Sequence, residues 1–221
     1  MVLEIAPYPG HIEELRLIGG RLCLDFANTF SSRHALFRRD YLIGYDDLLD
    51  WGRYTGAIDL ALAGQLSDEA ARWPEVAAAT IQRARALREA IYHVFTATSR
   101  GASPSPPDLD ILNTALATAQ SRLRLRPEPD GWTWTWLDDD PPALDRVLWP
   151  VMRSAADLLT SPDIGRVRAC PGEAGGCGWL FLDTSKGNQR RWCQMRDCGN
   201  RAKVRRYYAR FRATPATTPG Q

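Results

Sequence analysis

Hydrophobic residues recur every three or four positions over much of the first 160 residues, which is the period of an amphipathic α-helix. The longest run follows Pro74 and continues through Thr98, with Ala84, Leu87 and Ile91 on one face. This run predicts a central core helix. Shorter runs predict further helices at 21–30, 45–54, 109–120 and 142–160.

Between the last two of these helices the period changes to two. Leucines alternate with arginines before an Asp-Gly turn, and three tryptophans alternate with threonines after it, which predicts a β-hairpin over residues 122–137. Three tryptophans can bury several hundred Å² (roughly 150–250 Å² each), so we expect them to lie against the helices as core. They are Trp132, Trp134 and Trp136.

An aromatic ligand pocket is the alternative for this hairpin. Asp25, Asn28 and Arg88 are polar residues set among apolar helical positions, and they are candidates to line a pocket beneath the tryptophans. Polar groups in such positions more often bond to one another or cap a turn. The candidate pocket residues are therefore Asp25, Asn28, Arg88, Trp132 and Trp134, with a small-molecule effector as ligand.

The C-terminal part combines both periods. Residues 178–183 have the pattern of a short apolar strand, and after a turn 190–192 lead back, which predicts a second hairpin. Gly199 and the capping residue Asn200 then predict the start of a helix over 201–212. Its apolar stripe is expected to pack on this hairpin and consists of Val204, Tyr207, Tyr208 and Phe211.

With 44% hydrophobic and 24% charged residues, the 221-residue chain has the composition of a soluble globular protein. It has neither an apolar run long enough to span a membrane nor an N-terminal export signal, so a cytoplasmic protein is expected. The pattern predicts a mainly α fold with a β-hairpin (α+β). We expect a helical domain at 1–160, a small module at 161–213 and a flexible tail at 214–221.

Positive charge is concentrated in the C-terminal module. Between Arg166 and Arg212 there are 12 lysines and arginines against three acids, a net charge of +9, whereas the rest of the chain has −7. Local cations attract the phosphate backbone and displace its counterions, so this asymmetry favours nucleic-acid binding. The alternative is that these arginines only solvate the outer face of a small module.

Four of the five cysteines lie in this module as two close pairs, with six residues between Cys170 and Cys177 and four between Cys193 and Cys198. Zn²⁺ prefers a tetrahedron of soft ligands, which two such pairs can supply. Disulfides, an iron–sulfur cluster and four unrelated buried thiols are the alternatives, and disulfides suit a chain without an export signal poorly. The fifth, Cys23, is expected to be a buried small apolar residue.

Catalysis is not expected from this sequence. A zinc ion with four cysteine ligands has no open position for water, so it would be structural. The histidines, His11, His34 and His93, are far apart in sequence and belong to no recognisable catalytic motif. A glycine-rich phosphate-binding loop is also absent from the sequence.

The module contains the tetrad Cys198-Gly199-Asn200-Arg201 and the segments Cys-Gly-Trp-Leu-Phe-Leu-Asp and Arg-Arg-Trp-Cys. Over its whole length it resembles the CGNR zinc fingers. In that family the finger usually follows an ABATE domain, which the first 160 residues resemble. The resemblance implies a treble-clef-like finger and a DNA-binding regulator of bacterial stress transcription. It also implies one structural Zn²⁺, bound by Cys170, Cys177, Cys193 and Cys198.

DNA is the partner that the resemblance implies, and a homodimer is expected because one small finger would bind DNA weakly. Two other functions remain open: a structural or protein-interaction zinc module, and a regulator that binds a small molecule. The N-terminal domain would then be a sensor or an oligomerisation domain. The candidate nucleic-acid contacts are Arg190, Arg191, Arg201, Lys203, Arg205, Arg206 and Arg210.

Overall fold

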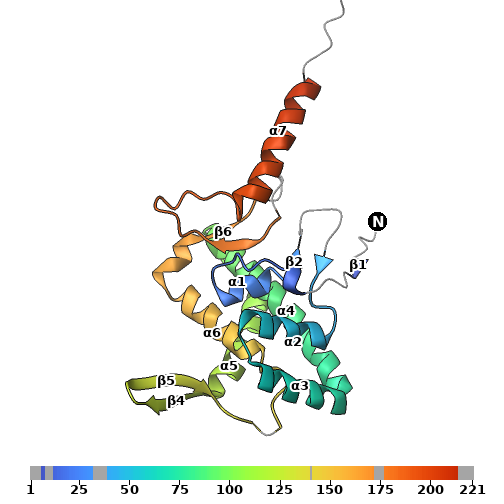
Figure 1. The fold of residues 1–221 in the computed structure, drawn as a ribbon. Helices are drawn as coiled ribbons and strands as arrows, with labels where there is room; N and C mark the ends of the chain where they lie inside the picture. Colours follow the sequence, from blue (N-terminus) through green and yellow to red (C-terminus); the bar gives the residue numbers. More distant parts are fainter. Residues whose placement is uncertain (1–5, 8–11, 32–38, 140, 172–176, 214–221) are drawn as a thin grey trace, which may run out of the picture.

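The computed structural model of the protein describes residues 6–7, 12–31, 39–139, 141–171 and 177–213 (Figure 1). The tail expected at 214–221 lies outside these residues. The fold is mainly helical with small sheets, as predicted. The helices are α1 (Leu22–Ala27), α2 (Tyr45–Thr55), α3 (Leu60–Arg72), α4 (Pro74–Ser99), α5 (Pro106–Ser121), α6 (Leu148–Leu159) and α7 (Asn200–Ala213). The strands are β1 (Ala6–Pro7), β2 (Phe30–Ser31), β3 (Arg39–Asp40), β4 (Leu123–Glu128), β5 (Gly131–Trp136), β6 (Val167–Ala169) and β7 (Leu180–Leu182).

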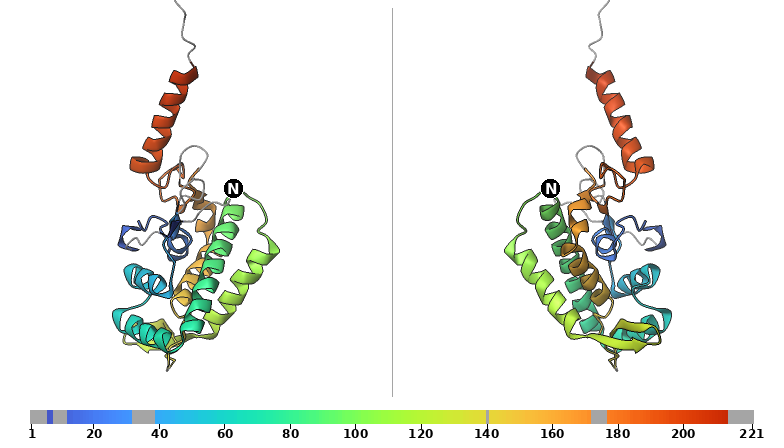
Figure 2. Two further views of the ribbon diagram at one scale, coloured as in Figure 1. Left: turned by 90° about the vertical axis from the view of Figure 1, so that its right-hand side faces the viewer. Right: turned by 90° about the vertical axis from the view of Figure 1, so that its left-hand side faces the viewer.

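The central element is α4, which the hydrophobic pattern predicted. Pro74 stands in its first turn, where a missing backbone N–H costs nothing. The helix buries Ala84, Ile91 and Phe95 and packs against α1, α2 and α5 in the core (Figure 2). Although α4 is 26 residues long, neither it nor any other helix in the described part of the chain is apolar enough to cross a membrane.

Two helices begin at other residues than predicted, and α3 was not predicted. α5 begins earlier because Ser105 Oγ caps it, accepting a hydrogen bond from the N–H of Asp108. α6 begins later, at Leu148, after a segment without regular structure. α3 buries Ala63, Leu66 and Glu69 along one face, and Asp59 caps its start by accepting a hydrogen bond from the N–H of Leu62.

The predicted hairpin is present as β4 and β5, but it does not join the core. Its six-residue strands pair antiparallel along their whole length and extend away from the helices (Figure 1). The strands leave the body at the Arg122–Asp139 ion pair, and of the three tryptophans only Trp136, at the base, is half-buried. The expectation of three core tryptophans is therefore wrong for Trp132 and Trp134, which are 72% and 53% exposed.

The C-terminal module contains a different hairpin from the predicted one. β7 pairs antiparallel with β6, which precedes the first cysteine pair, and not with residues 190–192. The other edge of β7 faces the region of α1: the N–H of Leu182 donates to the carbonyl of Gly19, and the Asn28 side chain bonds to Leu180. Both edges of β7 are thus hydrogen-bonded, so residues 190–192 have no free edge to pair with.

α7 stands clear of the rest of the molecule in every view (Figures 1 and 2). The expectation that its apolar stripe packs on the hairpin is wrong for Val204, Tyr207 and Tyr208, which are 53%, 59% and 62% exposed. The side chain of Phe211 lies outside the described ones. The β6–β7 hairpin has no face left for α7, because one side joins the helical core and Phe181 on the other joins the cysteines.

Candidate metal centre

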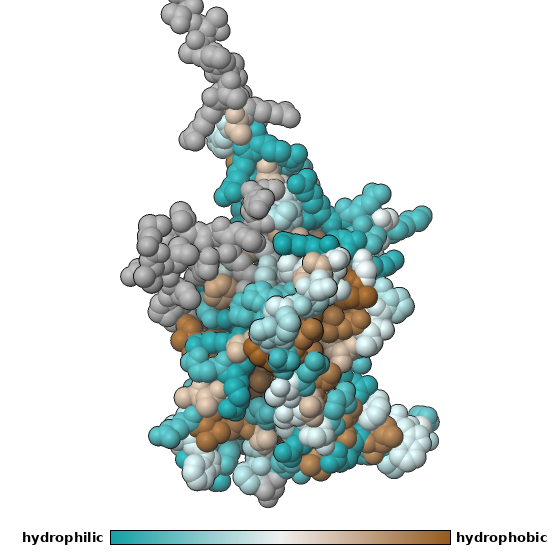
Figure 3. Space-filling model, turned by 180° about the vertical axis from the view of Figure 1, so that it is seen from behind, coloured by the Kyte–Doolittle hydropathy of each residue, from teal (hydrophilic) through white to brown (hydrophobic). Residues whose placement is uncertain are grey.

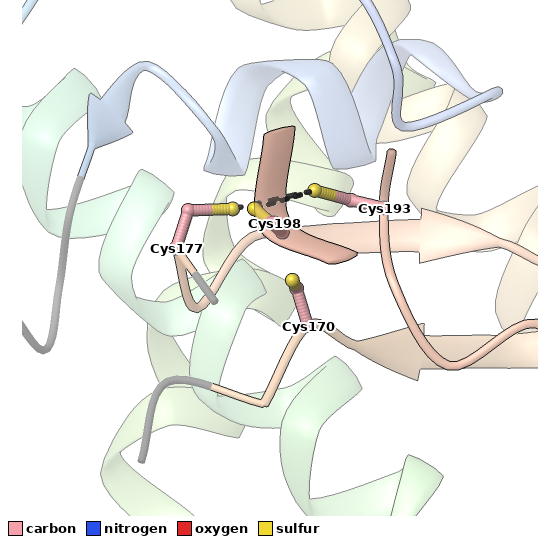
Figure 4. A group of neighbouring side chains, drawn as sticks. All are labelled: Cys170, Cys177, Cys193 and Cys198. Atoms are coloured by element: carbon pink, nitrogen blue, oxygen red, sulfur yellow. Dashed lines mark hydrogen bonds between the residues drawn. The ribbon is translucent and has the colours of Figure 1, made fainter. Parts of the chain in front are cut away.

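Four cysteine side chains converge at the base of α7 (Figure 4). Cys170 follows β6 and Cys177 precedes β7, so the first pair flanks the β6–β7 connection. Cys193 follows the turn after β7, and Cys198 lies in a π-helical turn, Met195–Gly199, that leads into α7. The four Sγ atoms all lie within 4.8 Å of one another, so the fold brings the predicted ligands together.

The spacing of the sulfur atoms fits a single zinc ion. The Sγ atoms of Cys177 and Cys193 are 3.4 Å apart, and those of Cys193 and Cys198 are 3.6 Å apart. A tetrahedral ion with Zn–S bonds of about 2.3 Å separates its ligands by about 3.8 Å, whereas a disulfide bond is about 2.05 Å long. The group is therefore a structural Zn²⁺ site with four protein ligands. Cys23 lies outside it, buried in α1 as predicted.

The chemistry of the group also suits a bound cation. Cys170, Cys193 and Cys198 are buried, and Cys177 is half-buried. Side-chain hydrogen bonds, that of Cys170 first, lower the pKa of Cys198 far below its ordinary value. Side-chain hydrogen bonds with Cys170, Cys177 and Cys198 raise the pKa of Cys193. Crowded thiols thus resist ionising together. Zn²⁺ supplies the positive charge that allows all four to bind as thiolates.

The residues that follow the last ligand each have a defined contact. A Cβ on Gly199 would lie 2.4 Å from Met195 Sδ, so a larger residue would displace that side chain. Asn200 Nδ2 donates to a backbone carbonyl of the π-helical turn at 2.8 Å and ties α7 to it. Arg201 Nη2 donates to Cys198 Sγ at 3.1 Å. The tetrad therefore shapes the metal centre and the start of α7.

Arg190 holds the loop that carries the second cysteine pair. Its guanidinium donates to the carbonyls of Trp192 and Cys193 and lies 4.8 Å from the centre of the Phe181 ring. Its backbone N–H donates to Asp183 at 2.8 Å. Arg190 is therefore engaged inside the module.

The predicted nucleic-acid contacts have different surroundings. Arg190 and Arg201 face the metal centre, and Arg191 lies over the ring of Trp192. The side chain of Arg210 lies outside the described ones. Figure 3 shows α7 as a hydrophilic projection from the body. Among the α7 side chains that the structure describes, the exposed cations are Arg201 at the first turn, then Lys203, Arg205 and Arg206.

Several contacts join the zinc module to the N-terminal domain, and the sequence pattern predicted none of the following. The Asn28 side chain donates to the Leu180 carbonyl at 2.8 Å and accepts from the Leu180 N–H at 2.9 Å. Arg16 forms an ion pair with Asp197 and a hydrogen bond with Gln194. The partners are 152 residues or more apart in sequence, so no local pattern could indicate them.

The five candidate pocket residues are not brought together. Asp25 accepts a backbone N–H just before α1, and Asn28 bonds to β7, so both stabilise the junction with the zinc module. Arg88 forms a buried ion pair with the aspartate of β3. Trp132 and Trp134 lie on the β4–β5 hairpin, away from α1 (Figure 1).

Two open cavities lie elsewhere. One of about 640 Å³ lies between α3 and the segment 137–146, with mostly acidic and apolar lining. Another of about 610 Å³ lies beside the cysteines, where Arg16, Trp179 and Arg205 contribute to its wall. Neither is lined by the predicted pocket residues.

Two family models match the chain in the order of its two parts. The ABATE model, described as "Putative stress-induced transcription regulator", matches residues 20–162, more than half of the chain. The CGNR zinc finger model matches residues 166–211, which include all four ligands. No curated protein matched the chain. The chain therefore belongs to the ABATE family, and its C-terminal module is a CGNR zinc finger.

Proposed function

We propose that the protein is a transcription regulator that binds duplex DNA through α7, with the N-terminal domain as its sensor or oligomerisation domain. The observation that carries this proposal is the position of α7, clear of the body, with Lys203, Arg205 and Arg206 exposed along it. Its 14 residues span about 21 Å at about 1.5 Å per residue. The major groove of B-DNA, about 12 Å wide, admits such a helix.

The charge distribution also favours the C-terminal module as the part that contacts DNA. Residues 166–212 carry +9 and the rest of the chain −7. Binding one Zn²⁺ by four thiolates would lower the module to about +7. DNA phosphates would attract α7 and repel the acidic body, so the protein would approach DNA with the finger first.

Zinc would contribute to DNA binding indirectly, by orienting α7. Cys193 precedes the π-helical turn and Cys198 lies within it, so an ion bound to both would fix the direction in which α7 leaves the module. The ion supplies electrostatic and geometric stabilisation. With four cysteine ligands it leaves no position for water, and we propose no enzymatic activity.

The test is fluorescence anisotropy of a labelled random-sequence duplex across a salt series, with the zinc-loaded full chain. We expect the logarithm of affinity to fall linearly with the logarithm of salt concentration, at about 0.9 units per phosphate contact. The double variant Arg205→Gln/Arg206→Gln should bind more weakly and show a shallower slope. Arg100→Gln, which removes an exposed charge at the end of α4, is the matched control and should behave as wild type.

A protein-interaction role for α7 is the second candidate, favoured by its exposed Val204 and Tyr208. A helix with cations and apolar residues can seat its apolar side in a groove of another protein. No DNA binding at low salt, with wild-type and Arg205→Gln/Arg206→Gln alike, would overturn the DNA proposal and favour this alternative.

A further inference from the structure

The β4–β5 hairpin carries an exposed apolar surface. Alternation along paired strands places six apolar residues on one side, which we call the tryptophan face. Its outer part is 53% to 72% exposed at Leu125, Trp132 and Trp134. Contiguous exposed apolar surface of this kind marks interaction sites in folded proteins. The tryptophan face consists of Leu123, Leu125, Pro127, Trp132, Trp134 and Trp136.

We propose that the tryptophan face binds the same face of a second copy of the chain, forming a symmetric dimer. The inference deepens the proposed function, on which it rests, because two copies would present two α7 helices to DNA. The hairpin and α7 lie at opposite ends of the molecule, so pairing through the hairpin leaves α7 accessible (Figure 1).

The β4–β5 hairpin would be stabilised by a partner that covers its tryptophan face. An isolated two-stranded hairpin is at best marginally stable in water and gains stability by packing its apolar face. Here the base packs on the body, where the ring centres of Trp136 and Trp149 are 5.8 Å apart. Further out, Trp134 is contacted on one side by the guanidinium of Arg153 at 4.7 Å.

The exposed area supplies about two thirds of what the smaller stable dimer interfaces bury. At roughly 150–250 Å² per aromatic side chain, Leu125, Trp132 and Trp134 together expose about 400 Å². Two copies would bury about 800 Å² through these residues, and the half-buried base adds more, against about 1,200 Å² for the smaller stable interfaces. Tryptophans are also among the residues that contribute most to binding energy at interfaces.

Charge favours a copy of this chain over DNA as the occupant. None of the six residues of the tryptophan face is charged, and the guanidiniums over Trp136 and Trp134 come from the body, from Arg146 and Arg153. The other side of the hairpin has Arg124, Arg126 and Glu128. A symmetric contact pairs each patch with itself, so an uncharged patch avoids like-charge repulsion. The cations of α7, by contrast, would repel one another in a similar pairing.

The test is sedimentation equilibrium of the full zinc-loaded chain without DNA, over a range of concentrations. We expect wild type to dimerise, and Trp132→Ser/Trp134→Ser to weaken dimerisation by roughly tenfold or more. Trp73→Ser is the matched control, since Trp73 is 59% exposed at the α3–α4 junction, and it should dimerise as wild type.

Leu125→Glu gives an independent check, because it places two like charges in the proposed contact without removing a tryptophan. It should also leave the protein monomeric, with an unchanged helical circular dichroism spectrum. Wild type that stays monomeric at its highest soluble concentration, or hairpin variants that dimerise normally, would overturn the inference. Dimers that fail to bind DNA would contradict the proposed function alone.

Discussion

Arg201 shows how a residue's role depends on the atoms around it. By sequence it belongs with the cations expected to contact DNA, yet its guanidinium donates to the sulfur of a zinc ligand. A Zn²⁺ with four thiolates has a net charge of −2, and a neighbouring guanidinium offsets part of it. The same contact raises the pKa of Arg201. We therefore place Arg201 at the metal centre.

Replacing Arg201 should weaken zinc binding. Outer contacts to metal ligands typically contribute tenfold to a hundredfold in affinity, so we expect a loss of roughly that size in Arg201→Gln. Competition with a chromogenic chelator measures it. Lys203→Gln loses the same charge two residues further along α7 and should keep wild-type zinc affinity. If Arg201→Gln retained zinc normally and instead lowered the salt slope of DNA binding, Arg201 would be a DNA contact.

The buried carboxyl of Asp25 should make the stability of the folded protein depend on pH. Burial raises the pKa of its carboxyl from 3.8 to about 6. The folded state therefore binds more protons between these values, so the free energy of unfolding should fall as pH rises through the window, by about 3 kcal/mol at most.

Asp25→Asn should remove this dependence, because its amide oxygen can still accept the N–H of Gly19. Urea unfolding at a series of pH values from about 4 to 7 measures the effect. Asp68→Asn, at an exposed position of α3, serves as the control and should leave the wild-type profile unchanged. An equal slope in Asp25→Asn and wild type would show that other groups cause the dependence.

At the scale of elements, the junction between α1 and β7 decides how the finger is attached. The Asn28 amide bonds to both backbone groups of Leu180 and so acts like a neighbouring strand along the edge of β7. Next to it, the Trp179 indole N–H donates to the carbonyl of Phe30 at 3.2 Å. Buried backbone groups need partners, and here α1 and the residues after it supply them.

Asn28→Ala should destabilise the whole chain. It leaves a buried N–H and a buried carbonyl without their partner, at about 1–3 kcal/mol each, so we expect a loss of about 2–6 kcal/mol. Chemical unfolding measures it. Asn113→Ala, at an exposed position of α5, is the matched control and should change stability little. A loss no larger than that of the control would mean that the junction contributes little to folding.

At the scale of the whole molecule, the finger is only partly a separate unit. Val167, Trp179, Leu180 and Leu182 belong to the same buried core as α1 and α4, whereas a smaller cluster surrounds the cysteines. The β6–β7 hairpin thus folds with the helical body. The second cysteine pair and α7 depend mainly on the metal.

Zinc removal should therefore release only part of the module. After chelation we expect fast amide hydrogen exchange from about 190 to 213, because the metal holds this segment, with protection retained in β6, β7 and α1. Hydrogen exchange with mass spectrometry measures it, and Cys198→Ser without chelator should reproduce the pattern. Loss of protection in β7 together with α7 would show that residues 166–212 unfold as one independent unit.

Much of this organisation could be predicted from local signals. The period of hydrophobic residues indicated α4, the alternation around Asp130-Gly131 indicated the β4–β5 hairpin, and cysteine spacing indicated the metal ligands. The errors concern what each element packs against. The outer tryptophans and the stripe of α7 have the composition of core residues, and composition does not reveal whether a covering surface exists.

The sequence alone determined most of the helices, the β4–β5 hairpin and the zinc ligands, because helix period, strand alternation and thiol spacing are properties of neighbouring residues. Only the tertiary structure decided that β7 pairs with β6, that Asn28 holds its other edge, and that Arg190 and Arg201 serve the metal centre. These contacts depend on which surfaces meet after the chain has folded. Residues 152 positions apart then become hydrogen-bond partners.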